Sequence, residues 1–231
     1  MEKPKENKNH YASPVQREIL LKLLTHPLIK ESFFLTGGTA LSVFYLYHRV
    51  SDDLDFFSLQ SVDFAEIDYW IRSSWKGSCS KIKQGPDFLS FLIEGTKVDF
   101  VMDALSNKEN RERVALESDL TLSIDNIDNI ASNKLSCMVS RTEPKDFIDT
   151  YFLFKNYPEL KIEDVYKNAK LKDAIFDDPP TAAFQLEEGI SFIKENPSIM
   201  PELKKEVNFK DVISFFEDLL EWMYAQFKVK G

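Results

Sequence analysis

Three aspartates within apolar segments are the residues best suited to do chemistry. Asp53 and Asp55 lie in "SDDLDFFSL", and Asp99 lies in "KVDFV". In a strand, Asp53 and Asp55 would share one face while Leu54 and Phe56 entered the core. Like charges held together are costly unless a cation lies between them, and carboxylate oxygens suit Mg²⁺. If the strand of Asp99 pairs beside that of Asp55, we predict that all three carboxylates are catalytic and bind Mg²⁺ or Mn²⁺.

Two glycines and a threonine, Gly37, Gly38 and Thr39, stand between a predicted strand and a predicted helix. Glycine permits close backbone approach, and the first N–H groups of a helix are unpaired, so this turn suits a phosphate group. Each pattern is weak alone, because a lone Asp-x-Asp often ends a strand in solvent and most strand-to-helix turns need glycine. Together they predict a triphosphate at the helix start beside metal-binding carboxylates.

Arg49 and Ser51 precede the carboxylates and are further candidates for nucleotide binding. Arg49 could reach a phosphate or bind a core carboxylate, and Ser51 could instead stabilise the loop before the strand. His48 is expected to cap the preceding helix rather than to do chemistry.

A second polar group lies in "ASNKLSCMVSRTEPKDFIDTYFL". Lys134 and Arg141 are seven positions apart and would share a helix face, where they could contact triphosphate oxygens together with Lys145. Asp146 and Asp149 also share a face, and Asp149 is a candidate base or positioning residue. Lys145 and Asp146 could alternatively form a structural ion pair. The competing interpretation is a solvated acidic pair among ordinary surface cations.

Composition limits the classes of partner. The chain has 231 residues, of which 43% are hydrophobic, and a net charge of −9. This charge disfavours general binding to nucleic acid, so an RNA acceptor would need a locally basic patch. Two cysteines, a polar start without a signal segment and the absence of an 18-residue apolar run predict a cytoplasmic protein that does not span a membrane. Zinc is disfavoured because no Cys/His cluster exists.

Apolar periodicity predicts a mixed α/β half followed by a helical half. Strands are expected at residues 32–35, 53–59, 79–84, 87–94 and 97–102. Helices are expected at residues 15–28, 39–48, 64–75, 127–139, 144–154, 162–171, 181–194 and 209–228. Residues 1–12 are expected to form a loose arm.

The segment "LTGGTALSVFYLYHRVSDDLDFF" resembles the first motif of the nucleotidyltransferase AbiEii/AbiGii toxin family, within the polymerase-beta-like superfamily. "KVDFV" resembles the strand that carries the third acid, and residues 131–153 resemble the family's second conserved block. The resemblance covers about residues 33–155. It implies an α+β nucleotidyltransferase fold with a mixed β-sheet core at residues 1–125, and a helical region at residues 126–231 that completes the active-site cleft.

The resemblance also implies a reaction. A nucleoside monophosphate would pass from an NTP to an acceptor hydroxyl with release of pyrophosphate, and tRNA or another RNA is a candidate acceptor. The physiological role would be the toxin of a bacterial toxin–antitoxin or phage-defence system, held in check by a cognate antitoxin. The alternatives are transfer to a protein or small-molecule acceptor, and a catalytically silent nucleotide-binding module that works through a protein partner.

Overall fold

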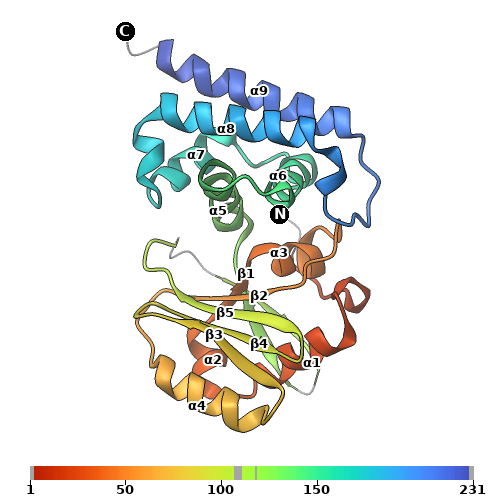
Figure 1. The fold of residues 1–231 in the computed structure, drawn as a ribbon, viewed down its shortest axis with the longest axis vertical. Coiled ribbons are helices and arrows are strands. Elements are labelled where there is room, and N and C mark those ends of the chain that lie inside the picture. The colour runs from red at the N-terminus through yellow and green to blue at the C-terminus, as the bar shows by residue number, and fades with distance from the viewer. Residues whose placement is uncertain (1–2, 107–110, 118, 229–231) are drawn as a thin grey trace. The chain divides into compact units, whose positions relative to one another are not determined.

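The computed structural model describes residues 3–106, 111–117 and 119–228 (Figure 1). The chain divides into two compact units, Glu2–Asn126 and Ile127–Gly231. Over the described residues, no helix is long and apolar enough to cross a membrane.

The first unit is built on a mixed sheet. Its strands, among the described residues, are β1 (Phe34–Thr36), β2 (Leu54–Ser58), β3 (Cys79–Gln84), β4 (Phe88–Ile93), β5 (Thr96–Met102), β6 (Glu112–Ala115) and β7 (Thr121–Ile124). They follow the order β3-β4-β5-β2-β1-β7-β6. β2 runs parallel to β5 and β1 parallel to β7, whereas the other neighbours are antiparallel. The mixed sheet confirms the predicted α+β class, and β6 and β7 are strands that the sequence analysis did not predict.

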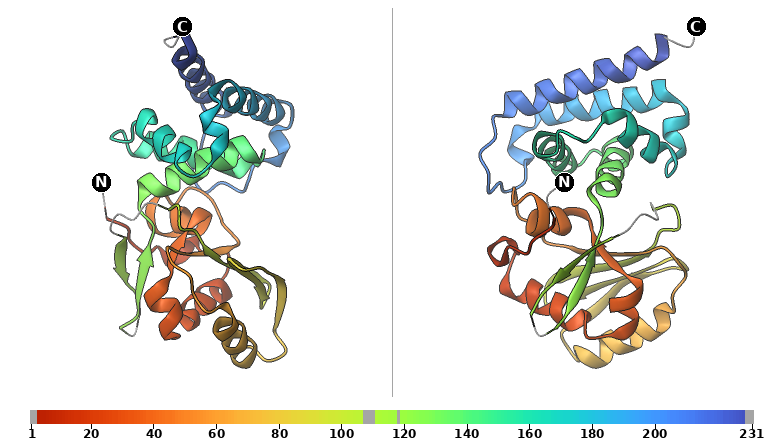
Figure 2. Two further views of the ribbon diagram at one scale, coloured as in Figure 1. Left: turned by 90° about the vertical axis from the view of Figure 1, so that its left-hand side faces the viewer. Right: turned by 180° about the vertical axis from the view of Figure 1, so that it is seen from behind.

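Three helices lie on one side of this sheet, namely α1 (Pro14–Leu23), α2 (Pro27–Ser32) and α4 (Phe64–Ser74) (Figures 1 and 2). The prediction of a single helix at residues 15–28 is therefore wrong, because α1 ends at Leu23 and a new helix begins at Pro27. Proline disfavours helical backbone at the residue before it and is well placed in the first turn of a new helix. α4 begins after Asp63, whose carboxylate accepts a hydrogen bond from the backbone N–H of Ala65 at 2.9 Å.

The helix predicted at residues 39–48 begins earlier and is shorter. It consists of α3 (Gly37–Ala40) and one π-helical turn, η2 (Leu41–Tyr45). The described part of the N-terminal arm packs along this turn, where the N–H groups of Lys5 and Asn7 donate to the carbonyls of Phe44 and Val43, each at 2.9 Å. The prediction of a loose arm is therefore wrong for residues 3–12.

The second unit is helical throughout its main elements. Its helices are α5 (Ile127–Ser140), α6 (Pro144–Asn156), α7 (Ile162–Lys170), α8 (Pro179–Glu195) and α9 (Phe209–Lys228). α5 packs on α6, α7 and α8, and α9 packs along α8 (Figure 1). The rings of Phe147 and Phe216 meet edge to face with centroids 4.9 Å apart. Gly189 makes room for them, because a Cβ atom there would lie 2.7 Å from the Phe147 ring.

Candidate active site

The parallel pairing of β2 with β5 places two carboxylates opposite each other. Asp55 is in register with Asp99, and Phe56 is in register with Phe100. The two phenylalanine rings are fully buried and stacked, with centroids 5.4 Å apart and planes at 15°. Since side chains alternate along a strand, both aspartates emerge on the other face, where each is half-buried. The strand pairing on which the predicted acidic site depended is therefore present.

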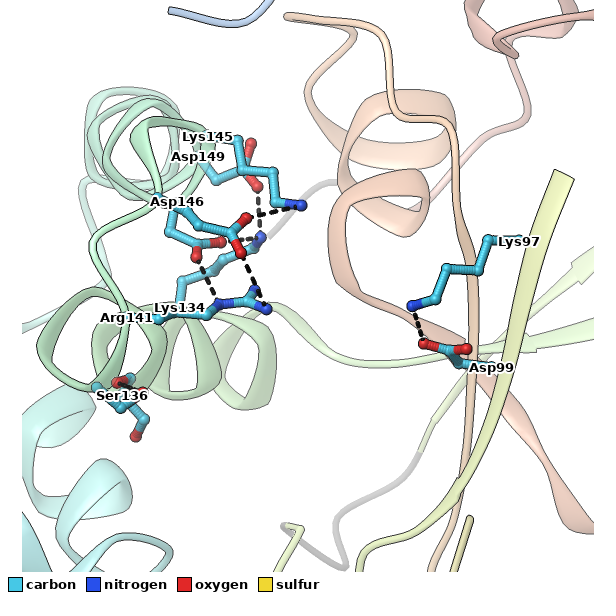
Figure 3. A network of polar contacts seen from close by, with 10 residues as sticks. Lys97, Asp99, Lys134, Ser136, Arg141, Lys145, Asp146 and Asp149 are labelled. Atoms are coloured by element: carbon cyan, nitrogen blue, oxygen red, sulfur yellow. Dashed lines mark hydrogen bonds and ion pairs between the residues drawn. The ribbon is translucent and has the colours of Figure 1, made fainter. Parts of the chain in front are cut away.

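Lys97 lies two residues before Asp99 on β5 and so shares its face. Its ammonium group donates to the Asp99 carboxylate (Figure 3). Burial lowers the pKa of Lys97, but the hydrogen bond to Asp99 and the negative charges of Asp99, Asp53 and Asp55 outweigh this effect and raise it. One cation thus interacts with all three predicted acids.

Asp99 is further fixed by Ser90 on β4, which is its register partner on the other side. The Ser90 hydroxyl donates to the Asp99 carboxylate at 2.5 Å. With Lys97 on one oxygen and Ser90 on the other, the orientation of this carboxylate is set before any ligand binds.

Asp53 differs from the prediction, because β2 begins one residue after it, at Leu54. The chain before the strand is held by other groups. The Thr39 hydroxyl donates to the backbone carbonyls of Asp53 and Ser51, and the Gln16 side chain donates to the Ser51 carbonyl at 2.9 Å. These bonds tie residues 51–53 to α3 and α1. In the structure, buried Thr39 positions the acidic loop.

The two glycines allow close contact with the chain's own side chains. Gly37 has a φ of +69°, and a Cβ atom there would lie 2.4 Å from a carboxylate oxygen of Asp55. A Cβ atom on Gly38 would lie 2.5 Å from both the Arg49 guanidinium and the Ser51 hydroxyl. Arg49 and Ser51 are buried, and the Arg49 guanidinium also donates to the Val50 carbonyl at 2.7 Å. The predicted phosphate turn is thus lined by a carboxylate, a guanidinium and a hydroxyl.

The helical unit holds a second cluster, centred on Lys134 of α5 (Figure 3). Its ammonium group pairs with Asp146 at 2.7 Å and with Asp149 at 2.6 Å, both on α6. The Lys134 side chain is only 7% exposed, and both carboxylates are fully buried. The structure therefore brings together the predicted residues Lys134, Asp146 and Asp149. In this cluster, the Lys134 ammonium already neutralises the negative charge of the buried carboxylates.

Arg141 and Lys145 lie at the edge of this cluster (Figure 3). Arg141 pairs with Asp146 at 3.2 Å. Burial lowers the pKa of Arg141, but the charges of Asp146, Cys137 and Glu143 together with the hydrogen bond to Asp146 outweigh this effect and raise it. Lys145 instead pairs with Glu143 at 2.8 Å and, through that hydrogen bond, lowers the pKa of Glu143. The predicted Lys145–Asp146 ion pair is therefore wrong, because Asp146 is taken by Lys134 and Arg141.

The residues of the sheet fit a divalent cation in part. Among the described residues, no three His, Cys, Asp or Glu side chains form a ready metal site. Asp55 and Asp99 nevertheless lie in register on neighbouring strands. The negative charges of both residues already attract one cation, the Lys97 ammonium. Mg²⁺ commonly takes only one or two protein carboxylates and completes its shell with water and substrate phosphates. This donor set suits a metal that arrives with a nucleotide.

Sequence reasoning missed Lys97 and Ser90. The signal for Lys97 was available, because a residue two before Asp99 on a strand must share its face. Ser90 could not be found in this way, since its contact depends on the register of β4 with β5.

Comparison with known proteins gives the family. The model of the family described as "Nucleotidyl transferase AbiEii toxin, Type IV TA system" matches residues 18–212. The chain belongs to the AbiEii family. This membership confirms the resemblance read from the sequence and identifies the chain as a nucleotidyltransferase.

Relatives of this AbiEii protein extend over nearly all of the chain. The uncharacterized protein aq_aa25 of Aquifex aeolicus (strain VF5) is 28% identical over 219 residues, which cover 92% of this chain and 94% of that protein. The fold is similar to that of MenT4, a nucleotidyltransferase toxin of Mycobacterium tuberculosis H37Rv, with a TM-score of 0.59, 17% identity, and coverage of 91% and 82% of the two chains. The fold is also similar to that of JHP933 from Helicobacter pylori, with a TM-score of 0.52 and 16% identity. The match covers 98% of this chain and 96% of JHP933.

The Gly37 contact gives a first prediction. Gly37→Ala should reduce the free energy of unfolding by more than the roughly 1 kcal/mol that a positive φ costs a non-glycine residue, because its Cβ atom must also displace Asp55. Nucleotide transfer should be lost with it. Gly95→Ala is the matched control, since Gly95 has a φ of +85° and nothing within 4 Å of a Cβ atom. Equal behaviour of the two variants in urea unfolding and in transfer would refute this role.

The Lys134 cluster gives a second prediction. Lys134→Met should lower the free energy of unfolding by about 3–5 kcal/mol, because it removes the buried ammonium that pairs with both Asp146 and Asp149. Adding Asp146→Asn and Asp149→Asn should recover part of this loss. Lys161→Met, at an exposed lysine of the same unit, should change stability by less than about 0.5 kcal/mol. Denaturant unfolding measures all three, and a stable Lys134→Met variant would contradict the assignment.

Proposed function

We propose that this protein transfers a nucleoside monophosphate from an NTP to a hydroxyl of an RNA acceptor, as the toxin of a toxin–antitoxin pair. The observation that carries the chemistry is the facing pair Asp55 and Asp99 with the Lys97 ammonium among the acids. Family membership supports the toxin role and a cognate antitoxin as the restraining partner.

Asp55 and Asp99 would hold Mg²⁺ or Mn²⁺, with Asp53 as the third acid. The metal would supply positive charge to the triphosphate and to the leaving pyrophosphate. Lys97 is 42% exposed on its side chain, so it can leave the carboxylates for solvent when the metal arrives. In the metal-free protein it offsets their repulsion.

The acceptor hydroxyl oxygen would attack the α-phosphorus, forming a new P–O bond as the bond from this phosphorus to the pyrophosphate oxygen breaks. The hydroxyl proton would pass to a carboxylate oxygen of Asp99, which Ser90 orients. Asp149 is the second candidate for the base, although it would first have to leave its buried ion pair with Lys134. Gly37, Gly38 and Arg49 would receive the triphosphate, since the guanidinium lies against the glycine turn. Lys134, Arg141 and Lys145 are further candidates for phosphate binding, although Lys134 would first have to exchange buried carboxylate partners.

Asp55→Asn and Asp99→Asn should each abolish transfer of label from an NTP to total RNA in the presence of Mg²⁺, because an amide cannot supply the anionic oxygens that a metal requires. Asp52→Asn is the matched control, at an exposed neighbour of the same charge. Each of the four NTPs should be assayed, with EDTA added in parallel. Loss of transfer in the Asp52 variant, or full activity in the other two, would reject the proposed site.

The same variants test the toxin role in bacteria. Expression of the wild type and of Asp52→Asn should slow growth, whereas Asp55→Asn should not. Aggregation of an aromatic-rich chain would instead impair growth in all three cases. Growth that is equal in all three, with transfer intact in vitro, would retain the chemistry and remove the toxin role.

A further inference from the structure

A basic hollow lies on the surface of the helical unit. It is an open hollow of about 670 Å³, lined by Lys155 of α6 and by residues 203–208, which include Lys204 and Lys205. Glu206 is the acidic residue in this lining. The lining thus carries three cations and one anion, whereas the whole chain has a net charge of −9. We refer to the hollow as the lysine pocket.

The charges of the lysine pocket are only partly neutralised. Lys205 makes no ion pair with any described residue, whereas Lys204 pairs with Glu202 at 2.6 Å. Lys155 donates to the Tyr151 hydroxyl at 3.2 Å and lies over the same ring, with 5.2 Å from its nitrogen to the centroid. These contacts hold the Lys155 ammonium in place without cancelling its charge. The pocket therefore retains positive charge, and Lys155 supplies part of it at a defined position.

The first turn of α9 adds to the positive potential of the lysine pocket. Asn208, the last residue of the lining, accepts a hydrogen bond at its side chain from the N–H of Lys210 and at its carbonyl from the N–H of Asp211, each at 3.0 Å. It therefore caps a helix of 20 residues. The N-terminal end of such a helix carries partial positive charge and favours anions. The lysines and the helix end act in the same direction.

We propose that the lysine pocket binds backbone phosphates of the RNA acceptor. This inference rests on the proposed function, because it names the chemistry that recognises the acceptor. An acidic protein repels RNA over most of its surface, so binding must come from a local group of cations.

Binding of a labelled single-stranded RNA oligonucleotide, measured without NTP over about 50–200 mM salt, tests the proposal. The Lys155→Gln/Lys205→Gln variant should bind more weakly, and its plot of log affinity against log salt should be shallower by about 1.4, because each phosphate contact to a single strand contributes about 0.7. Lys161→Gln/Lys167→Gln removes two exposed lysines of the same unit outside the pocket and should leave the slope unchanged. An equal effect of both variants, or no effect of either, would overturn the proposal.

Inorganic triphosphate serves as the competitor that distinguishes free phosphate from RNA. It should displace the oligonucleotide only when its phosphate concentration greatly exceeds that of the RNA. Displacement at matched phosphate concentration would assign the pocket to a free anion and overturn the RNA proposal.

Transfer assays separate this proposal from the proposed function. The Lys155→Gln/Lys205→Gln variant should raise KM for RNA and leave kcat and KM for the NTP unchanged. A wild type that binds RNA through the pocket and transfers nothing would refute the proposed function while supporting the pocket. A variant that transfers to RNA with the wild-type KM would refute the pocket and leave the function intact.

Discussion

The in-register pairing of β2 with β5 is the constraint on which the candidate active site depends. It sets Asp55 opposite Asp99 on one face and stacks Phe56 on Phe100 on the other. A shift of one residue would turn the carboxylates into the core and the rings outward. Burial of the rings and exposure of the acids therefore favour the same register. The stacked phenylalanines thus contribute to the candidate active site only by fixing the register that sets Asp55 opposite Asp99.

A lysine held by carboxylates occurs in both units, and its exposure separates two roles. Lys134 is 7% exposed between fully buried Asp146 and Asp149, so its removal takes away a counter-charge that solvent cannot replace. Lys97 is 42% exposed beside Asp99, so its ammonium can leave for solvent at low cost. The first arrangement suits a permanent support of the helical unit. The second suits the proposed metal site, which would remain folded before a metal binds and release its internal cation afterwards.

The sequence was sufficient to locate those strands and helices that local apolar periodicity determines. Alternation of apolar residues located β2, β4 and β5, and helical spacing with Pro144 located α6. Contacts between distant segments were not accessible in this way. β7 is a four-residue strand that pairs with β1 from across the unit, and Asp53 leaves the strand because Thr39 and Gln16 hold the loop before it.

The glycine turn shows the same limit. Its composition predicted a turn that a phosphate can approach closely, and phosphate binding there stays a prediction. Which group approaches depends on tertiary structure, and in the folded chain the Asp55 carboxylate, the Arg49 guanidinium and the Ser51 hydroxyl lie against the two glycines. The burial of Lys134 likewise follows from the packing of α5 on α6, which its spacing to Arg141 does not reveal.

The most direct test of this account is a crystal structure of the protein with Mn²⁺ and a non-hydrolysable NTP. Anomalous scattering locates the metal independently of any assay of transfer. The account predicts a Mn²⁺ peak at about 2.0–2.3 Å from oxygens of both Asp55 and Asp99, with the Lys97 ammonium moved away from Asp99. A nucleotide bound with its metal elsewhere, or with Lys97 still on Asp99, would contradict it.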